Sequence, residues 1–398
     1  MTPKKITVKE LINLLPTHLI EDTSKKTKVD YQVKKLTGEK IFHLLLMSLL
    51  DSERVSLRVM EDLYQSKQFQ VYADLKEGEK TSFTSLSDRL MAINPIFFKE
   101  IFEATHEILT HNFKTAEIKG YSILRYDATS ISAPAKLLSI GIRNGRPNKE
   151  GVHSLRQMKI TVGFDGLIPK EVSLFKDQSY ASDDLAIGEA LLAGNVKKDE
   201  IIVFDRGVKK RTTFELMQEQ AKLFVTRINP TKNYKVVKVL HRIAGSKTAT
   251  LEFKSDEEVY LFHGHECRKT KNTFRLIRAT RLEDGQELLF LTNIKDLTAA
   301  EIADVYKSRW DIEVFFRFLK QELNLKHFIS YSENGIKVMI YMTLITAMLV
   351  LVYKKINKIT GYKRAKRLFV EGLDTEIVRS IVLLCGGDPD KSHHLKPT

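Results

Sequence analysis

Cysteine is scarce in this sequence of 398 residues, which has only Cys267 and Cys385. Two cysteines cannot form a framework of several disulfides, and they cannot supply a zinc site made of four cysteines. A small secreted fold held together by disulfides is therefore excluded. The composition fits a protein that folds in a reducing compartment.

Long hydrophobic runs are also missing. The first residues, MTPKKITVKELINLL, carry charges between the apolar positions and lack the apolar stretch of a signal peptide. The most apolar run, IYMTLITAMLVLVY at 340–353, has 14 residues. A membrane span needs about 20 apolar residues. This run therefore predicts a buried core helix, and we expect a cytoplasmic protein with no membrane partner.

The sequence contains no Walker A motif, so it gives no indication of a nucleotide cofactor. What it has in excess is positive charge. Lys and Arg number 64 against 50 Asp and Glu, which gives a net charge of +14 and a pI near 9.4. Such an excess favours a polyanionic partner, and nucleic acid is the first candidate. Charge alone leaves open a basic protein that is merely soluble.

The residue patterns change along the chain and predict an α/β protein with helices at both ends. The first part reads as amphipathic helices with scattered basic residues, which suits either a DNA-binding domain or a plain packing domain. Apolar strands such as YSILRYDATSIS and EIIVFDRG follow, then shorter antiparallel strands, then long helices. The predicted divisions are 1–115 (helical, DNA-binding), 116–228 (first part of the core), 229–285 (β insertion), 286–355 (rest of the core) and 356–398 (helical segment and tail).

Three acidic residues stand in positions that suit chemistry. Asp127 and Asp205 follow apolar strand segments, and Glu313 lies in a predicted helix. Most such residues, taken singly, cap turns or face solvent. Together, however, three carboxylates form a ligand set for hard cations such as Mg²⁺ or Mn²⁺. Two such ions about 3.5 to 4 Å apart can hold a phosphodiester for cleavage.

The helix that contains Glu313 predicts a polar stripe. At about 100° per residue, Tyr306, Arg309, Glu313 and Lys320 fall within an arc of about 60°, beside an apolar face. Arg, Lys and Tyr side chains can hold phosphate oxygens next to a metal. The alternative is a solvated face with ion pairs at helical spacing.

In this order, the motifs resemble those of bacterial insertion-sequence transposases of the DDE class, in the insertion-sequence-four family. YKSRWDIEVFFRFLK is similar to the Y-R-E-K motif of that family. YDATSIS is similar to its first-Asp strand, and IIVFDRG with the later KLFVTRI to its second-Asp block. The resemblance covers roughly residues 120–330. It implies a core with the RNase H-like fold, interrupted by an antiparallel β insertion.

The resemblance also implies roles for these residues. Asp127, Asp205 and Glu313 would be the catalytic triad that binds Mg²⁺ or Mn²⁺, as two ions. Tyr306, Arg309 and Lys320 would contact DNA near the cut, and Trp310 would stack on a flipped base or, alternatively, pack under its helix. The expected activity is cut-and-paste transposition at the terminal inverted repeats of the element. Double-stranded DNA is the expected partner, both as element ends and as target, and a homodimer at the bacterial nucleoid is expected to hold it.

Two other functions remain open from the sequence. One is a catalytically silent DNA-binding descendant, and the other is a metal-dependent nuclease on the same fold. A further candidate, HGHEC at 263–267, offers His263, His265 and Cys267 to zinc but has no evident fourth ligand, so plain structure is the favoured interpretation. Basic patches at 143–149, 209–211 and 232–238 are candidates for phosphate contacts or simply solvated surface.

Overall fold

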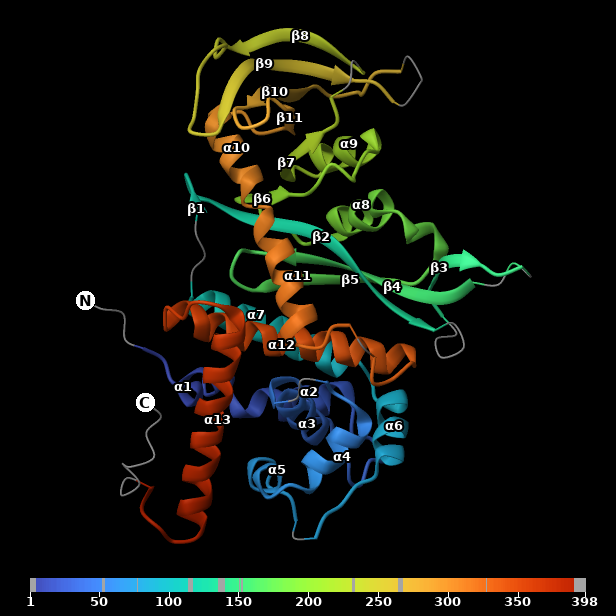
Figure 1. Ribbon diagram of the computed structural model, residues 1–398, viewed down its shortest axis with the longest axis vertical. Helices are drawn as coiled ribbons and strands as arrows, with labels where there is room; N and C mark the ends of the chain where they lie inside the picture. The colour runs from blue at the N-terminus through green and yellow to red at the C-terminus, as the bar shows by residue number, and fades with distance from the viewer. Residues whose placement is uncertain are drawn as a thin grey trace. The chain divides into compact units, whose positions relative to one another are not determined.

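The computed structural model describes most of the chain in two compact units. The residues outside the description are 1–4, 52–53, 77, 114–116, 135–139, 150, 152, 231–232, 264–267, 327 and 390–398. One unit combines residues 1–114, 133–139 and 317–398, and is helical. The other combines 115–132 and 140–316, and contains the sheet (Figure 1). We call them the helical unit and the sheet unit.

The sheet unit is organised around eleven strands in one mixed sheet of the described residues, in the order β3-β4-β2-β6-β7-β11-β10-β9-β8, with β1 on β2 and β5 on β4. The strands are β1 Glu117–Ile118, β2 Tyr121–Pro134, β3 Ile142–Pro147, β4 His153–Phe164, β5 Pro169–Phe175, β6 Glu200–Val203, β7 Leu223–Ile228, β8 Tyr234–His241, β9 Leu251–Leu261, β10 Phe274–Arg281 and β11 Glu287–Thr292.

The centre of this sheet has the topology of an RNase H-like core. β5, β4 and β2 come first, with β5 antiparallel to β4; β6 then pairs parallel with β2, and β7 pairs parallel with β6. Helices α8 Asp183–Ala193 and α9 Arg211–Glu219 make the crossovers before β6 and before β7. All four residues of β6 are buried, as the apolar run EIIV predicts for a central strand. The predicted mixed α/β core is therefore confirmed.

Strand alternation assigns the two faces of this core. Leu124, Tyr126, Ile202 and Phe204 pack in one apolar cluster with residues of α8 and α9. The intervening residues, such as Ile201 and Val203, pack in a second cluster with residues of α10 Ala299–Lys307. Successive side chains of a strand point to opposite faces. Asp127 and Asp205 therefore belong to the face that α10 covers.

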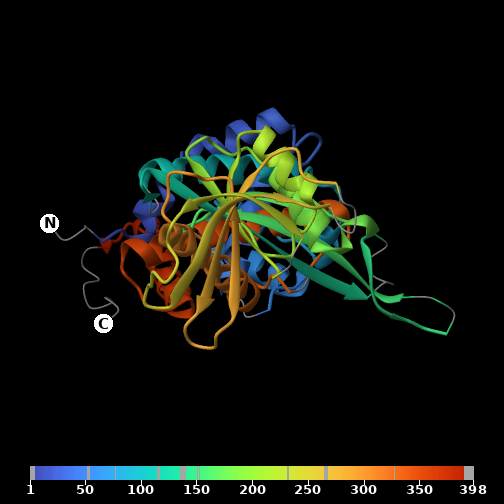
Figure 2. The ribbon, with the colours of Figure 1, turned by 90° about the horizontal axis from the view of Figure 1, so that it is seen from above.

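The predicted β insertion continues the core sheet. β8, β9, β10 and β11 form successive antiparallel pairs, and β11 pairs with β7 of the core (Figure 2). A buried ion pair ties these strands to the segment that leads into α10. Arg275 on β10 makes two hydrogen bonds to Asp256 on β9, at 2.8 and 2.7 Å, and both side chains are almost fully buried. The same guanidinium donates to the carbonyls of Ile294 and Leu297, just before α10.

The helical unit consists of helices from both ends of the chain. They are α1 Val8–Ile12, α2 Thr17–Thr27, α3 Gly38–Asp51, α4 Leu57–Gln65, α5 Lys67–Tyr72, α6 Phe83–Ala92, α7 Ile96–Asn112, α12 Glu333–Ile356 and α13 Tyr362–Leu384. The apolar run at 340–353 lies in α12, which packs against α3, α6, α7 and α13. α12 is long and apolar enough to cross a membrane, but 94% of its most apolar window is buried in this unit. The prediction of a core helix is confirmed.

This division differs from the predicted one at the C-terminal side. The prediction keeps residues up to 355 with the catalytic core and separates 356–398. In the structure, residues from Arg317 onward join the N-terminal helices, because α12 buries its apolar surface against α7 and α3. The helical segment at 1–115 is thus half of a unit that the C-terminal helices complete.

Candidate active site

Asp127 and Asp205 are brought side by side by strand pairing. The parallel register of β2 and β6 runs to the pair Arg125–Val203. Both acids lie two residues beyond this pair, and they are close enough for the charge of Asp205 to raise the pKa of Asp127. Asp127 lies within β2 rather than after it, while Asp205 follows the end of β6.

Backbone amides hold both carboxylates. Asp127 Oδ1 accepts a hydrogen bond from Ala128 N at 2.8 Å, and Asp205 Oδ1 accepts one from Gly207 N at 2.8 Å. A Cβ at residue 207 would lie 2.7 Å from Asp205 Oδ1. The Gly in the DRG motif is therefore explained by the close approach of the aspartate to its own turn.

The segment with Tyr306, Arg309 and Glu313 is not the single helix that we predicted. α10 ends at Lys307, and α11 Trp310–Glu322 begins after a break at Ser308 and Arg309. At the break, the amides of Arg309 and Ile312 bond to carbonyls three residues earlier, at Tyr306 and Arg309. Ser308 Oγ also donates to the Val305 carbonyl at 2.7 Å, a local bond that competes with regular helix.

Arg125 explains why the chain breaks there. This buried arginine lies on β2, two residues before Asp127. Its Nε donates to the Ser308 carbonyl at 2.9 Å, and its Nη2 lies 3.2 Å from Asp311 Oδ2. The rings of Phe164 and Phe315 stack at 4.6 Å and fix the start of α11. The break is therefore anchored directly to the strand that carries Asp127.

Tyr306, Arg309 and Glu313 still come together across the break. Arg309 donates a hydrogen bond to Glu313 Oε1 in an ion pair, and its guanidinium carbon lies 6.0 Å from the centre of the Tyr306 ring. Arg227, on β7, lies 5.6 Å from the same ring. Burial raises the pKa of Tyr306, and the charges of Arg309 and Arg227 oppose this shift. Two arginines thus face one tyrosine beside the acids.

The three acids share one electrostatic environment. The pKa of Asp127 is raised to about 6, chiefly by burial and further by the charges of Asp205 and Glu313. The Ala128 amide and the charge of Arg309 act in the opposite direction. Burial is the largest cause of this shift in pKa, and repulsion from the two neighbouring carboxylates adds to it. A cation bound beside Asp127 would favour its charged form.

The donor chemistry of the site fits a hard divalent ion. Three carboxylates are oxygen ligands of the kind that Mg²⁺ and Mn²⁺ prefer. Within the part of the chain that the structure describes, no three His, Cys, Asp or Glu side chains are already grouped around a metal position. Glu313 is instead paired with Arg309. Arg309 bonds to Oε1 of Glu313, so ligation by all three acids would use Oε2 or would separate this pair.

The other predicted side chains have different surroundings. Trp310 is 54% exposed at the first residue of α11, which excludes the alternative that it packs under the helix. Lys320 lies on the part of α11 that belongs to the helical unit, so it is not one of the residues that the sheet unit gathers around Asp127. Its predicted DNA contact remains a prediction.

The zinc hypothesis at HGHEC falls largely outside the described residues, which omit 264–267. His263 is described, and its Nε2 lies 3.4 Å from Glu215 Oε2. Of the predicted basic patches, 143–149 covers most of β3 and the turn after it, and 209–211 leads into α9. The patch at 232–238 enters β8, whose side chains are mostly exposed.

Comparison with known proteins identifies the family. Residues 118–349 match the model of the transposase DDE domain, and the chain belongs to this family. Its members are enzymes that cleave and join DNA, and the domain implies dependence on a divalent metal. The matched region contains all three acids and the residues around them.

Named relatives agree with this assignment. The chain is 27% identical over 244 residues to a transposase of Sinorhizobium fredii, covering 61% of this chain and 64% of that protein. It is 30% identical over 153 residues to the transposase of element IS5377 from Geobacillus stearothermophilus, covering 38% of each. The chain therefore spans less than two thirds of the length of each of these two relatives. The transposase of element IS4SA from Synechocystis is 26% identical over 338 residues, with 84% of this chain and 86% of that protein covered.

Among solved structures, the chain is similar to a piggyBac transposase in a synaptic complex with hairpin DNA. The TM-score is 0.47 at 10% sequence identity, covering 96% of this chain and 83% of the other. The assignment of the fold rests on the order and pairing of the strands in the sheet unit.

Sequence reasoning missed three residues that organise the site. Arg125 and Arg227 lie inside apolar strands, where an arginine among the apolar residues of YSILRYD and LFVTRI was the available signal. A charge in a buried strand needs a partner. Gly207 lies within the DRG motif. A glycine is required there because Asp205 approaches the backbone closely, and this follows from the geometry of the turn and not from the sequence.

The raised pKa of Asp127 predicts how stability depends on pH without metal. A carboxyl whose pKa is raised by folding stabilises the protein below its unfolded pKa near 3.8, and this contribution is lost as the pH rises through about 6. In EDTA, Asp127→Asn should therefore raise the free energy of unfolding at pH 7.5, on the order of 2 kcal/mol. The gain should shrink toward zero at pH 4.

Urea unfolding at the two pH values measures this difference. Asp199→Asn, which changes an exposed aspartate of the same unit, serves as the control and should give no such gain. Equal pH dependence in the wild type and the Asp127 variant would show that folding does not raise the pKa of Asp127 in the metal-free chain.

Proposed function

We propose that this chain is a DDE transposase that binds the terminal inverted repeats of its own insertion sequence, cleaves the DNA there with two divalent metal ions, and joins the 3′ ends to target DNA. The observation that carries the proposal is the gathering of Asp127, Asp205 and Glu313 with Tyr306, Arg309 and Arg227 on one face of the sheet. Membership of the DDE family supports it.

Each of these residues has a proposed role. Asp127, Asp205 and Glu313 hold Mg²⁺ or Mn²⁺, and bound ions of this kind supply an activated water or 3′-hydroxyl and a stabilised leaving oxygen. Arg309, once Glu313 leaves it, is placed to bind phosphate oxygens through its planar guanidinium. Tyr306 and Arg227 add a hydroxyl donor and a positive charge on the same side. Cleavage and joining are both displacements at the phosphorus of a phosphodiester, so the same residues can serve both reactions.

Trp310 suits stacking on a base that has left the duplex. It is exposed, and it follows Arg309 directly in the chain. An aromatic ring in such a place can stack on an unpaired base. Lys320, further along α11, is proposed to contact the DNA backbone. Because two element ends must be held together for joining, a homodimer on the DNA is part of the proposal.

The test uses DNA from the borders of this protein's own gene, where inverted repeats should lie. Wild-type protein with Mg²⁺ or Mn²⁺ should cut at the repeat ends and, with target DNA added, produce joined products. Cleavage without joining would favour the nuclease alternative. Tight, repeat-specific binding without cleavage under either metal would favour the silent DNA-binding alternative.

Arg309→Ala should weaken engagement of the cleaved end. The substitution removes one guanidinium that would bind phosphate, so the slope of log K against log salt concentration should fall by about 0.9. Fluorescence anisotropy with a repeat-end duplex at several salt concentrations measures this slope. Arg317→Ala, on helix α11 that follows the break, removes the same charge and is the matched control. Identical slopes for wild type and Arg309→Ala would mean that the arginine serves only to pair with Glu313.

A further inference from the structure

The strongest concentration of positive charge in the helical unit lies where α12 turns into α13, outside the three acidic motifs and the Y-R-E-K segment. Seven of the fourteen residues from 354 to 367 are Lys or Arg, and no acidic residue occurs from 334 to 370. The cations are Lys354, Lys355, Lys358, Lys363, Arg364, Lys366 and Arg367. We call this set the α12–α13 basic surface.

Some of these charges have an ordinary structural reason. Lys354 and Lys355 lie in the last turn of α12, where a helix end favours cations. Lys354 Nζ also lies 4.8 Å from the centre of the Tyr362 ring, and Lys366 Nζ donates to the Glu322 carbonyl at 2.8 Å. These residues alone would not suggest a ligand.

The positive charges of Lys363, Arg364 and Arg367 are not explained by a helix C-terminus. They are exposed in the first two turns of α13, where the positive end of the helix dipole disfavours cations. Arg367 has an exposed partner, Glu371, at 3.4 Å. Among the residues that the structure describes, no ion pair is formed by Lys363 or Arg364. Three exposed cations thus gather at a helix end that disfavours positive charge, and an anionic partner would offset this unfavourable interaction.

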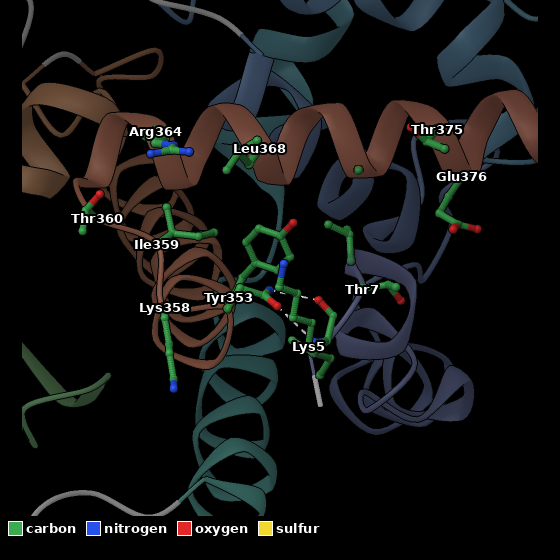
Figure 3. Close-up of a pocket in the computed structure, with 14 residues that line it drawn as sticks. Lys5, Thr7, Tyr353, Lys358, Ile359, Thr360, Arg364, Leu368, Thr375 and Glu376 are labelled. Atoms are coloured by element: carbon green, nitrogen blue, oxygen red, sulfur yellow. Dashed lines mark hydrogen bonds between the residues drawn. The ribbon is translucent and has the colours of Figure 1, made fainter. Parts of the chain in front are cut away.

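The surface around these cations is hollowed on two sides. A cavity of about 1030 Å³ is lined by Lys363, Arg364, Lys366 and Arg367, together with residues of α3 and the end of α11. A second cavity of about 520 Å³ lies between α13 and the N-terminal segment, and Arg364 lines it as well. In Figure 3, Arg364, Thr360 and Lys358 lie toward one end of the second cavity, and Glu376 lies at the opposite end. Arg364 therefore lines both cavities, and the acidic residues Asp51, Glu322 and Glu371 line the larger one as well.

We propose that the α12–α13 basic surface binds the phosphate backbone of duplex DNA, without reading its sequence. The proposal rests on the proposed function in so far as DNA is the substrate. Arg367 lies four residues after Lys363 and three after Arg364, so both are its neighbours on the helix surface, and the three cations present a row of positive charge rather than a single pocket. Neutralisation of phosphates by such a row binds DNA through counterion release. The helical unit would then carry its main DNA contact on C-terminal helices, and not on the N-terminal helices for which the sequence suggested it.

The test is a binding measurement with full-length protein in EDTA and a labelled duplex that lacks the inverted repeats. Wild type is compared with the triple variant Lys363→Gln, Arg364→Gln and Arg367→Gln, since Gln is a good helix former. The control variant is Lys34→Gln, Lys35→Gln and Lys80→Gln, which removes the same charge from exposed positions of the same unit. Affinity is measured across a range of salt concentrations.

The slope of log K against log salt should fall by about 2.7 in the α13 variant, if all three cations contact phosphates, and by less than about one in the control. Equal slopes in the two variants would overturn the proposal. Circular dichroism checks that the variants fold; if the triple variant does not, Arg364→Gln alone should lower the slope by about 0.9. The assay contains neither metal nor element ends, so its outcome is independent of whether the protein cleaves DNA.

Discussion

Glu313→Gln should abolish metal-dependent cleavage of the element ends while leaving the protein folded and able to bind them. Gln keeps the size of the side chain and can still accept a hydrogen bond from Arg309, but it loses the charge that a divalent ion requires. A loss on the order of 10³-fold or more in the cleavage rate is expected when one member of such a catalytic group is removed. Gel analysis of end-labelled repeat DNA under single-turnover conditions measures the rate.

Glu322→Gln provides the matched control, because it makes the same chemical change at the last residue of the same helix. It should cleave at the wild-type rate. A Glu313→Gln protein that also cleaves at the wild-type rate would remove Glu313 from the triad, and a protein that no longer binds the repeat ends would show that its role is structural.

Asp256→Asn should produce the largest loss of stability in the sheet unit. Arg275 would keep its charge in a site where it is almost fully buried, but the negative charge of its partner would be gone and only neutral oxygens would face it, namely the Asn amide oxygen and the carbonyls of Ile294 and Leu297. Removing one partner of a buried ion pair typically costs about 3 to 5 kcal/mol. Urea unfolding measures the total, and amide hydrogen exchange of β9 and β10 assigns the loss to these strands.

The control for this experiment is Glu287→Gln, which breaks the half-exposed pair with Arg278 on the neighbouring strands. A pair of this kind contributes about 1 kcal/mol or less. If Asp256→Asn were as mild as the control, Arg275 would not be the residue that ties the β insertion to the start of α10. The predicted cost therefore tests whether this insertion is part of the catalytic framework.

The sequence predicted those parts of the fold that depend on local pattern. The buried strand EIIV and the apolar helix at 340–353 were recognisable because their burial follows directly from composition. The start of α10 also follows local pattern, because threonine is a preferred N-cap residue and the Thr298 side chain accepts a hydrogen bond from Glu301 N. The position of each element relative to others was harder to predict, because it depends on contacts between distant residues.

Two features of the structure could not be predicted from local sequence pattern. The helical wheel placed Tyr306, Arg309 and Glu313 on one stripe, yet the helix breaks between them because Arg125 takes the Ser308 carbonyl from 183 residues away. Likewise, the N-terminal helices gave no sign that they share a unit with α12 and α13. Residue periodicity reports local structure only. It cannot predict a hydrogen bond between a side chain and a distant backbone carbonyl, or the packing of helices from opposite ends of the chain.

The single tryptophan of the chain gives the candidate site its own optical signal. Trp310 is 54% exposed beside Arg309, and no other tryptophan contributes to the emission. A base that stacked on this indole would shield it from water and quench its fluorescence, whereas binding elsewhere on the molecule would leave the emission unchanged. Stopped-flow fluorescence of the unmodified protein could therefore separate arrival of DNA at the helical unit from engagement of the strand to be cut.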